Sequence, residues 1–551
     1  MDKLFIIAIG GTGMRCLESF THLCAIGMFD SREIDLLTLD TDQSNGNKAK
    51  VEQQVQLYNR IKTSGTIAGG TPNANTFFSA KLNLHRYYTN YSGVGRENFK
   101  NISKLSSGTS EQQKANKLLS DLFLDNTTVQ EFGLAHGYRA QTHLGSMLMY
   151  HGIIETARNL AKGGNVEPQE RELDAFISKI EAAGANARVF IFGSIFGGTG
   201  ASAIPVLPKA LQDFVTIRSG GKSSIDLSSA KFGSTLLTEY FTFNKPDNKQ
   251  KSNKENSIIA DSSFFPLNSQ AALQFYQSDP TVQKSYKILY HIGWPIESKK
   301  IDAGTSGHET ITGGATQKNP CHITELICAC AAYDFFTRET GFDGAKAEYL
   351  FKAVGFNNNT FNFSFNDFVG NTNKAGDTFA NRLGAFFSLA HICLAKNGAA
   401  EGDNGLKGFI SQFENQAISE YSSITDAECS EIDTYFKDFT YTFDNERFVP
   451  GWLYQVRNTV APGNFMFDSS AFPDSKPELR NIDVGALFLD KKHHWSDARS
   501  IRNMTGNRYE NFVGKLINSG AKQDQKVSTP KEKFLAHIYN ALSDSQNFNL
   551  N

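Results

Sequence analysis

Short apolar runs alternate with helical patterns along the first 340 residues of the chain. Five runs have the length of a buried β-strand, at residues 4–9, 34–39, 189–192, 231–243 and 287–292. Several of them are followed by segments in which apolar residues recur every three or four positions, as at Leu17, Phe20 and Leu23. Strands that alternate with helices in this way predict an α/β fold.

Helical patterns are also found in other parts of the chain. They cover residues 137–153, part of 161–186, 266–276, 319–340, 379–394, 451–458 and 529–542. Pro208 predicts a kink or an early end in the helix that begins near Ser202. Residues 45–130 are polar and rich in Asn, Ser, Gly and Lys, with a short amphipathic piece at 117–123. We interpret this range as an insertion.

A strand, a glycine loop and a helix follow one another in residues 188–211, which read RVFIFGSIFGGTGASAIPVLPKAL. Such a junction directs unpaired backbone N–H groups and the positive end of a helix dipole at one point, which suits a phosphate group. Glycines let the ligand approach the backbone and tolerate positive φ. This stretch therefore predicts a phosphate-binding loop, with a purely structural turn as the alternative.

A second junction of the same kind lies at the start of the chain, where GGTG at 10–13 follows the first apolar run. It departs from the dinucleotide fingerprint GxGxxG, because Cys16 stands where the third glycine is needed. Asp40 and Asp42 follow the next apolar run. In a dehydrogenase one acid at this place binds a ribose hydroxyl; two acids are also compatible with a capped turn at the end of a strand.

Residues 196–202, FGGTGAS, resemble the signature loop GGGTG(T/S)G of the tubulin/FtsZ superfamily, with Phe196 and Ala201 in place of glycines. The resemblance implies that two loops grip the phosphates of GTP. Their residues are Gly10, Gly11, Thr12, Gly13, Gly197, Gly198, Thr199, Gly200, Ala201 and Ser202.

The same resemblance assigns roles to further polar residues. Asp42 is the candidate for the shell of a Mg²⁺ ion, bound through water, and Asp40 supports it, since Mg²⁺ prefers oxygen ligands and keeps several waters. Residues 137–153 resemble the third phosphate loop, so the candidates for the γ-phosphate are Arg139, Ala140 and Gly145. An arginine in such a loop is also compatible with a solvated surface charge.

Two asparagines are the candidates for contacts with the guanine base. PLNSQAALQFY at 266–276 looks like the tubulin segment PYNATL, which places Asn268 at a helix start, and Asn319 precedes Pro320 where the central helix of the superfamily begins. An Asn amide can donate to and accept from the edge of a base. The alternative for each is an ordinary helix N-cap.

The candidate for catalysis is Asp367. Asn366, Asp367 and Phe368 are the nearest match to the N-x-D-F pattern of FtsZ, without its spacer. A carboxylate there would polarise the attacking water. Its rivals are Asp343, Glu348 and Asp377, and the alternative is a turn between a strand with Phe361, Phe363 and Phe365 and the helix at 379–394.

Composition narrows the class of protein. The 55 basic and 57 acidic residues give a net charge of −2, which implies no general attraction to nucleic acid or anionic membranes. The seven cysteines form no CxxC pair, which favours reduced thiols in the cytoplasm.

No apolar run reaches the ~20 residues of a membrane span, and residues 4–9 are too short for a signal-peptide core. His493 and His494 lack a third metal ligand, and the 44 phenylalanines indicate a large aromatic core.

The resemblance covers residues 1–340 without the insertion. It implies a doubly wound, Rossmann-like GTP-binding domain (1–318), a central helix (319–340), a second α+β domain (341–470) and a helical C-terminal extension (471–551). The function it implies is GTP–Mg²⁺ binding, head-to-tail assembly of the protein into filaments, and hydrolysis to GDP at the subunit interfaces.

Two alternatives remain. One is a non-polymerising, nucleotide-sensing scaffold with operon-encoded partners in a bacterial multi-protein system, such as a defence system. The other is a Rossmann oxidoreductase, which the missing third glycine disfavours.

Overall fold

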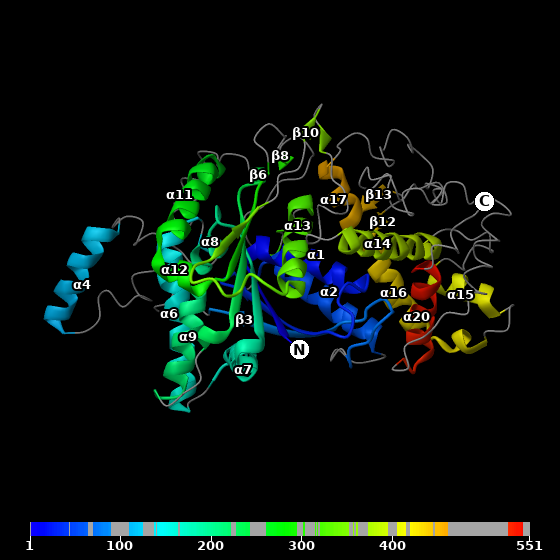
Figure 1. Cartoon of the computed structure of the whole chain (residues 1–551), viewed down its shortest axis with the longest axis horizontal. Coiled ribbons are helices and arrows are strands. Elements are labelled where there is room, and N and C mark those ends of the chain that lie inside the picture. Colours follow the sequence, from blue (N-terminus) through cyan, green and yellow to red (C-terminus); the bar gives the residue numbers. More distant parts are fainter. Residues whose placement is uncertain are drawn as a thin grey trace.

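A seven-stranded parallel sheet lies at the centre of the molecule (Figure 1). Its strands, in spatial order, are β3 (Lys81–Tyr88), β2 (Glu33–Asp40), β1 (Lys3–Ile9), β4 (Ala187–Phe192), β5 (Lys231–Leu237), β7 (Ile288–Ile292) and β9 (Glu348–Leu350). In the register of the central strands, Ile6 lies between Leu36 and Phe190. The prediction of an α/β fold is confirmed.

The computed structural model describes part of the chain. The described residues are 2–42, 44–63, 70–89, 109–124, 137–138, 140–163, 166–221, 227–242, 261–294, 301–302, 315, 317, 320–351, 356–357, 360–361, 373–394, 405–414, 419–444, 447–460 and 527–543.

Helices cover both faces of the sheet. One face packs against α1 (Gly10–Ala25), α2 (Gly46–Lys62) and α13 (Ile323–Thr337). The other packs against α6 (Thr142–Lys162), α7 (Pro168–Ala183), α9 (Leu207–Arg218), α11 (Phe265–Ser278) and α12 (Pro280–Ser285). Because both faces are covered, β4 is buried along its whole length, and after Arg188 it is a continuous apolar run from Val189 to Phe192.

A further layer of helices packs outside α1, α2 and α13, on the right of Figure 1. It contains α14 (Asn373–Leu394), α15 (Leu406–Glu414), α16 (Asp426–Phe439), α17 (Trp452–Val460) and α20 (Pro530–Ser543), with the 3-10 helix η6 (Ser419–Ser423). The buried Trp452 indole donates a hydrogen bond to Ser19 Oγ on α1 at 2.9 Å. The hydrophobic core is therefore continuous from the sheet into this layer.

Short strand pairs and one outlying helix complete the described elements. β6 (Phe241–Thr242) pairs with β8 (Ile301–Asp302), β10 (Phe356–Asn357) with β11 (Thr360–Phe361), and β12 (Tyr441–Asp444) with β13 (Arg447–Pro450). The helix α4 (Ser110–Phe123) stands apart from the rest in Figure 1.

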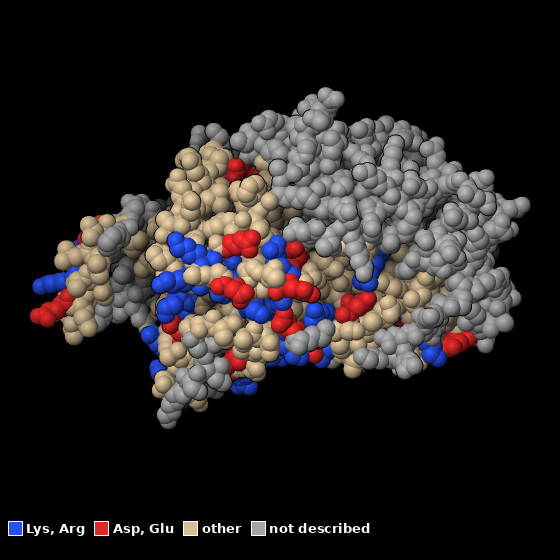
Figure 2. All heavy atoms as spheres, in the orientation of Figure 1, with Lys and Arg blue, Asp and Glu red and all other residues tan. Residues whose placement is uncertain are grey.

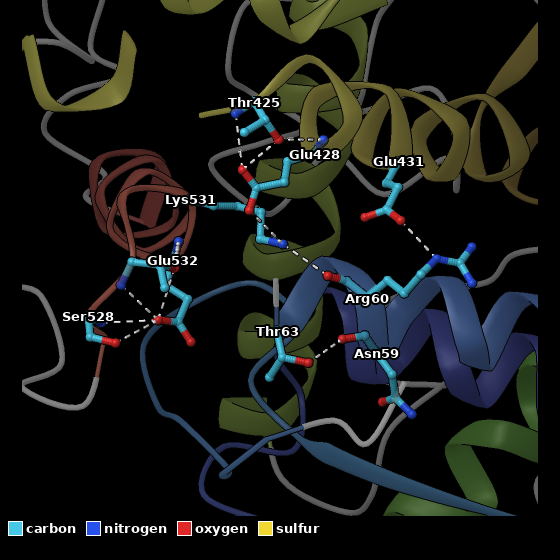
Figure 3. Close-up of polar contacts among 10 residues, drawn as sticks. Asn59, Arg60, Thr63, Thr425, Glu428, Glu431, Ser528, Lys531 and Glu532 are labelled. Carbon is cyan, nitrogen blue, oxygen red and sulfur yellow. Dashed lines mark hydrogen bonds and ion pairs between the residues drawn. The ribbon is translucent and has the colours of Figure 1, made fainter. Parts of the chain in front are cut away.

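Polar contacts fasten α16 and α20 to the end of α2 (Figure 3). Arg60 Nε lies 2.8 Å from Glu431 Oε1. The buried Lys531 ammonium donates to the Arg60 carbonyl at 2.9 Å and lies 3.5 Å from Glu428 Oε1. A buried ammonium group needs such partners. These contacts therefore hold α20 against α2 and α16.

Several predicted boundaries are wrong. Residues 45–130 contain α2 and β3, which are integral to the sheet and its cover. The predicted strand at 231–243 ends at Leu237 and resumes as β6. The helix expected from Asn319 and Pro320 begins at Ile323, where the His322 side chain is the N-cap and Glu325 completes a capping box.

Other boundary predictions have mixed outcomes. α14 begins at Asn373, earlier than expected. The break expected near Pro208 is confirmed, since α8 (Thr199–Ala203) ends before it and Pro208 lies in the first turn of α9. The proposed domain boundaries at 318, 340 and 470 stay predictions; β9, which follows the second of them, pairs with β7 in the central sheet. Among the described helices, none is long and apolar enough to cross a membrane.

Candidate functional site

The candidate site lies at the carboxyl edge of the sheet, between β1 and β4. The chain leaves β1 towards β2 and β3 on one side, whereas β4 opens the other half of the sheet. Loops that follow such neighbouring strands diverge and leave a crevice, which is where open α/β sheets bind ligands. The two predicted glycine segments lie at this point. The prediction of a loop at 10–13 is wrong, because α1 begins at Gly10 directly after β1 and GGTG forms its first turn, whereas the glycine-rich segment after β4 leads into α8 at Thr199.

Thr199 is the residue around which the loops of this edge meet. Gly10 has a φ of +65°, and a Cβ built on it would lie 3.1 Å from Thr199 Cβ. A Cβ on Gly137, whose φ is +76°, would lie 3.5 Å from Thr199 Oγ1 and 3.7 Å from Thr41 Oγ1. The start of α1, the loops after β2 and β4 and the segment before α6 therefore come together.

Other glycines of the predicted loops serve close packing. A Cβ on Gly13 would lie 2.5 Å from the Phe192 carbonyl, and one on Gly200 would lie 2.9 Å from the backbone of Ser194. A Cβ on Gly145 would collide with Ser202 Oγ. These positions need glycine for reasons of space, so their glycines alone do not point to a ligand.

Three helices start at this edge without a side-chain cap. The N-caps of α1, α6 and α8 are Ile9, Gln141 and Gly198, and none of these side chains accepts a hydrogen bond from its helix. By contrast, Asn45 and Thr425 cap α2 and α16 with their side chains. First-turn N–H groups without a cap need another acceptor, and an anion is a suitable one.

Asp40 and Asp42 are both buried at the end of β2. Asp40 Oδ1 accepts hydrogen bonds from the backbone N–H groups of Thr41 at 2.7 Å and of Asp42 at 3.2 Å. Burial raises the pKa of Asp40 to about 7, and the nearby Asp42 charge adds to this effect. Asp42 Oδ1 accepts from Ser44 N at 3.0 Å and from Ser44 Oγ at 2.8 Å.

Buried polar atoms without partners gather beside these carboxylates. Among the residues that the structure describes, Asp40 Oδ2, Thr41 Oγ1 and Asn47 Nδ2 are inaccessible to water and make no hydrogen bond. The Asn47 amide faces the start of α1, because a Cβ on Gly11 would lie 3.3 Å from its Nδ2. Such groups are costly unless something pairs with them, which makes this edge the candidate site.

Asn45 and Gln317 close one side of the same place. Asn45 Oδ1 accepts from Asn47 N at 2.9 Å and Lys48 N at 3.2 Å, and its Nδ2 donates to Gln317 Oε1 at 2.8 Å. A Cβ on Gly11 would lie 3.1 Å from that Gln317 oxygen. The sequence analysis missed Thr41, Asn45, Asn47 and Gln317; the N-x-N spacing directly after the two acids was the one signal that could have found Asn45 and Asn47.

Asn268 lies beside the glycine loop, in the first turns of α11. Its Nδ2 donates to the Phe196 carbonyl at 3.2 Å. The N-cap of α11 is Phe264, so the alternative that Asn268 is the cap is wrong. Phe196 itself is buried against Phe265, with ring centroids 4.8 Å apart, which accounts for an aromatic residue where the superfamily has glycine.

Other predicted site residues divide into two groups. Ala140 has a φ of +64° in the segment before α6, a conformation that residues other than glycine seldom adopt. Arg139, Asn319 and Asp367 lie outside the described residues. Of the rivals of Asp367, Asp343 and Glu348 are exposed, and Glu348 pairs with Ile288 at the start of β7, on the opposite edge of the sheet.

A buried polar network behind the site joins the start of α1 to the start of α13. Arg15 Nη2 lies 2.7 Å from Glu325 Oε1 and also donates to the Tyr240 hydroxyl. Tyr240 donates to Glu325 Oε1 at 2.6 Å, and the His322 N–H donates to Glu325 Oε2 at 2.9 Å. Sequence reasoning missed this network because each member lies inside an unremarkable helical or strand pattern.

The acidic groups suit one kind of metal better than others. Within the described part of the chain, no three His, Cys, Asp or Glu side chains come close enough to form a complete metal site. Mg²⁺ does not need such a cage, because it keeps several waters and takes one or two carboxylates together with phosphate oxygens. The unpartnered oxygen of Asp40 and the adjacent Asp42 fit that mode of binding.

Comparisons with known protein families and curated proteins give no match, so the function is inferred from the fold and the candidate site. No model of a known protein family matches the sequence, and a search of curated proteins finds no match. The structure defines an α/β protein with a seven-stranded parallel sheet flanked by helices, and the candidate site lies at its switch point.

Proposed function

We propose that this protein binds GTP with Mg²⁺ at the carboxyl edge of the sheet and assembles head to tail into filaments that hydrolyse the nucleotide at subunit contacts. The observation that carries the binding proposal is the group of unpartnered atoms, Asp40 Oδ2, Thr41 Oγ1 and Asn47 Nδ2, beside the uncapped start of α1. The choice of GTP rests on the resemblance of residues 196–202 to the tubulin/FtsZ signature.

In this proposal, different residues of the site bind different parts of the nucleotide. Backbone N–H groups at Gly10–Gly13 and in the loop 197–200 hold phosphate oxygens. Asp40 and Asp42 would hold Mg²⁺, which would neutralise phosphate charge when bound. Asn268 and Asn319 are the candidates for the base, Arg139, Ala140 and Gly145 for the γ-phosphate. Asn47 and Thr41 join the set as a donor and a hydroxyl towards the ligand.

Exposed apolar side chains on α11 support self-association. Phe264, Leu267 and Phe275 are between 47% and 61% exposed, and α11 contains no charged residue. Figure 2 shows the corresponding uncharged area at the upper left of the molecule. An exposed apolar stripe marks an interaction surface. Asn268 on the same helix donates a hydrogen bond to the glycine loop. A subunit contact through α11 would therefore be coupled to the conformation of that loop.

The positions of the acids fit head-to-tail assembly. Glu348 lies at the amino edge of the sheet and the phosphate loops at the carboxyl edge. When one copy stacks on the next, the amino edge of one meets the carboxyl edge of the other. An acid from the described segment after α13, Asp343 or Glu348, would then reach the nucleotide of the neighbour and polarise water.

Identification of the bound nucleotide tests the binding proposal. The purified protein is denatured and the released ligand is identified by chromatography; GDP or GTP supports the proposal, and NAD or FAD would replace it with the oxidoreductase alternative. Titration with fluorescent GTP and ATP analogues then gives the base preference. Asn47→Ala should weaken binding, whereas Asn159→Ala on α6, which removes a hydrogen bond to Glu170, should leave it unchanged.

Sedimentation and phosphate release test assembly. We expect GTP-dependent sedimentation and a release rate that rises more than linearly with protein concentration. A rate strictly proportional to concentration would count against hydrolysis between subunits.

The non-polymerising scaffold remains a second candidate because of α4. Leu118, Leu119 and Leu122 on this helix are 56–73% exposed, and such an apolar face favours a protein partner. Asp367→Ala helps to separate the two functions, because loss of turnover with retained GTP binding supports the filament-forming GTPase.

A further inference from the structure

A second cavity lies at the opposite edge of the sheet from the candidate nucleotide site. Its volume is ≈ 190 Å³, and its walls come from the start of β1, the loop after α1, the last turns of α13 and the middle of α14. Since β1 runs from this edge to the phosphate loops, the two sites are about 20 Å apart. The lining residues are Leu4, Met28, Phe29, Asp30, Arg32, Tyr333, Phe336, Thr337, Thr378 and Arg382.

The inner wall of the cavity is apolar and aromatic. Leu4, Met28, Phe29 and Phe336 are all buried. The Phe29 ring lies edge-on to Tyr333, with centroids 5.5 Å apart, and to Phe336 at 6.4 Å. These rings hold one another in place, so the wall exists before any ligand arrives.

The mouth of the cavity is polar, and most of its charges are already paired. Arg382 donates to the Gly27 carbonyl, and its Nη2 lies 3.1 Å from Asp30 Oδ2. The nearby Arg188 is occupied too, because it donates to the carbonyls of Phe335 at 2.9 Å and Arg338 at 2.6 Å and so caps the end of α13.

Arg32 is different from these two arginines. Its Nη1 is buried and has no hydrogen-bond partner in the described part of the chain. Burial lowers the pKa of Arg32, and the positive charge of Arg188 adds to this, with Asp2 acting in the opposite direction. Arg32 lines the cavity, and a carboxylate is a good partner for a guanidinium.

We propose that this cavity binds a small carboxylate with a single ring, with the ring against Phe29 and Phe336 and the carboxylate on Arg32. The size fits, because a dry protein cavity of about 150 Å³ accepts benzene and this one is moderately larger. Such a ligand touches α13 and α14 together and therefore ties the outer helical layer to the sheet. The site is independent of the nucleotide proposal.

Thermal unfolding and saturation-transfer NMR of the full chain test this site. The probes are benzoate, its neutral analogue benzamide, toluene and inorganic phosphate. We expect benzoate to raise Tm and to show transfer at its ring protons, with weaker binding of benzamide and toluene and none of phosphate. Nucleotide should not displace benzoate.

Two variants make the test specific. Arg32→Met should weaken benzoate binding about 10- to 100-fold, as expected for loss of a charge-assisted contact. Thr337→Trp, at an exposed position on the mouth, should block entry without disturbing the core. Arg60→Met removes a half-exposed arginine elsewhere and should bind like the wild type. Equal binding of benzoate and benzamide, or wild-type affinity in Arg32→Met, would overturn the proposal.

Discussion

Gly10 and Gly163 have the same φ, +65°, in different surroundings. Gly10 lies against Thr199 at the candidate site, whereas a Cβ on Gly163 meets nothing within 4 Å. Substitution with alanine imposes the same backbone strain at both, of about 1–2 kcal/mol. We expect Gly10→Ala and Gly163→Ala to lose similar stability in urea unfolding, with a small extra loss for Gly10→Ala from its closer neighbours.

Nucleotide binding should separate these two variants. Gly10→Ala places a methyl group between the first-turn N–H groups of α1 and Thr199, so we expect titration to show at least tenfold weaker binding of GTP, equivalent to about 1.4 kcal/mol. Gly163→Ala should bind like the wild type. Equal affinities in both variants would mean that the start of α1 does not contact the ligand.

Asp40 gives the ligand-free protein a defined pH dependence. Its pKa is about 7 in the folded chain against an ordinary value of 3.8, so the folded state keeps a proton that the unfolded state releases between these values. Stability from this group is therefore fully present below pH 3.8 and is lost as the pH rises through about 7. The variant Asp40→Asn has no carboxyl group at this position, so this loss of stability with rising pH should be absent.

Urea unfolding of the wild type and Asp40→Asn at several pH values measures this effect. Relative to the wild type, the free energy of unfolding of the variant should rise from about pH 4 to about pH 7. Above that pH the difference should stay constant, at most about 4 kcal/mol. Parallel stability curves over this range would show that Asp40 is ionised in the folded protein.

At the scale of elements, the strands that sequence patterns found are those buried on both faces. Apart from Lys3 and Arg188, β1 and β4 consist of apolar residues because helices cover both sides of the sheet. The sequence pattern missed β3 because it is an edge strand in which six of the eight residues are partly exposed, and its sequence KLNLHRYY is mixed. The apolar criterion could not find it.

The helix α2 shows a second reason why sequence patterns miss elements of the fold. Its inner face includes polar side chains that are buried because β3 and its preceding loop satisfy them: Asn59 Nδ2 donates to the Leu82 carbonyl at 3.0 Å, and Lys62 Nζ donates to Ser79 O at 2.9 Å. Such pairing depends on tertiary contacts, and so does the place of Asn47 at the site. The glycine loops were recognisable from sequence because local backbone geometry requires them.

The contact between α1 and α13 depends on the buried pair Arg15 and Glu325. Glu325→Gln leaves Arg15 buried without a counter-charge, so we expect the free energy of unfolding to fall by about 3–5 kcal/mol. Arg15→Met/Glu325→Leu should recover much of this loss, since no buried charge remains. Urea unfolding followed by the fluorescence of the buried Trp452 measures both.

An exposed ion pair serves as the control for this network. Lys407 and Asp426 form a pair in which both side chains are largely exposed, so Lys407→Met should cost less than about 1 kcal/mol. A similarly small cost for Glu325→Gln would mean that water reaches the Arg15 network.

At the scale of the whole molecule, the parallel sheet separates two edges that carry different candidate sites. The candidate phosphate segments, Asn268 and the apolar stripe of α11 belong to the carboxyl half, while Glu348 and the second cavity lie at the amino edge. A surface on one edge that fits a different surface on the other makes a heterologous contact, which generates open filaments rather than closed dimers. Assembly should therefore continue without a fixed subunit number.

The stripe on α11 provides the test of that assembly. Leu267→Asp/Phe275→Asp places two charges on an exposed helix face, so the fold should keep its Tm while GTP-dependent sedimentation is lost, because a carboxylate buried in an interface is strongly unfavourable. The matched control is Leu118→Asp/Leu122→Asp on α4, where the exposed leucines are assigned to the alternative function.

Binding and sedimentation measured on the same samples decide between the two surfaces. If the α11 variant still binds GTP but its phosphate release becomes proportional to protein concentration, α11 carries the subunit contact, since isolated subunits then hydrolyse without help from a neighbour. If instead the α4 variant alone loses sedimentation, the contact runs through α4. The stripe beside the glycine loop would then have no role in assembly.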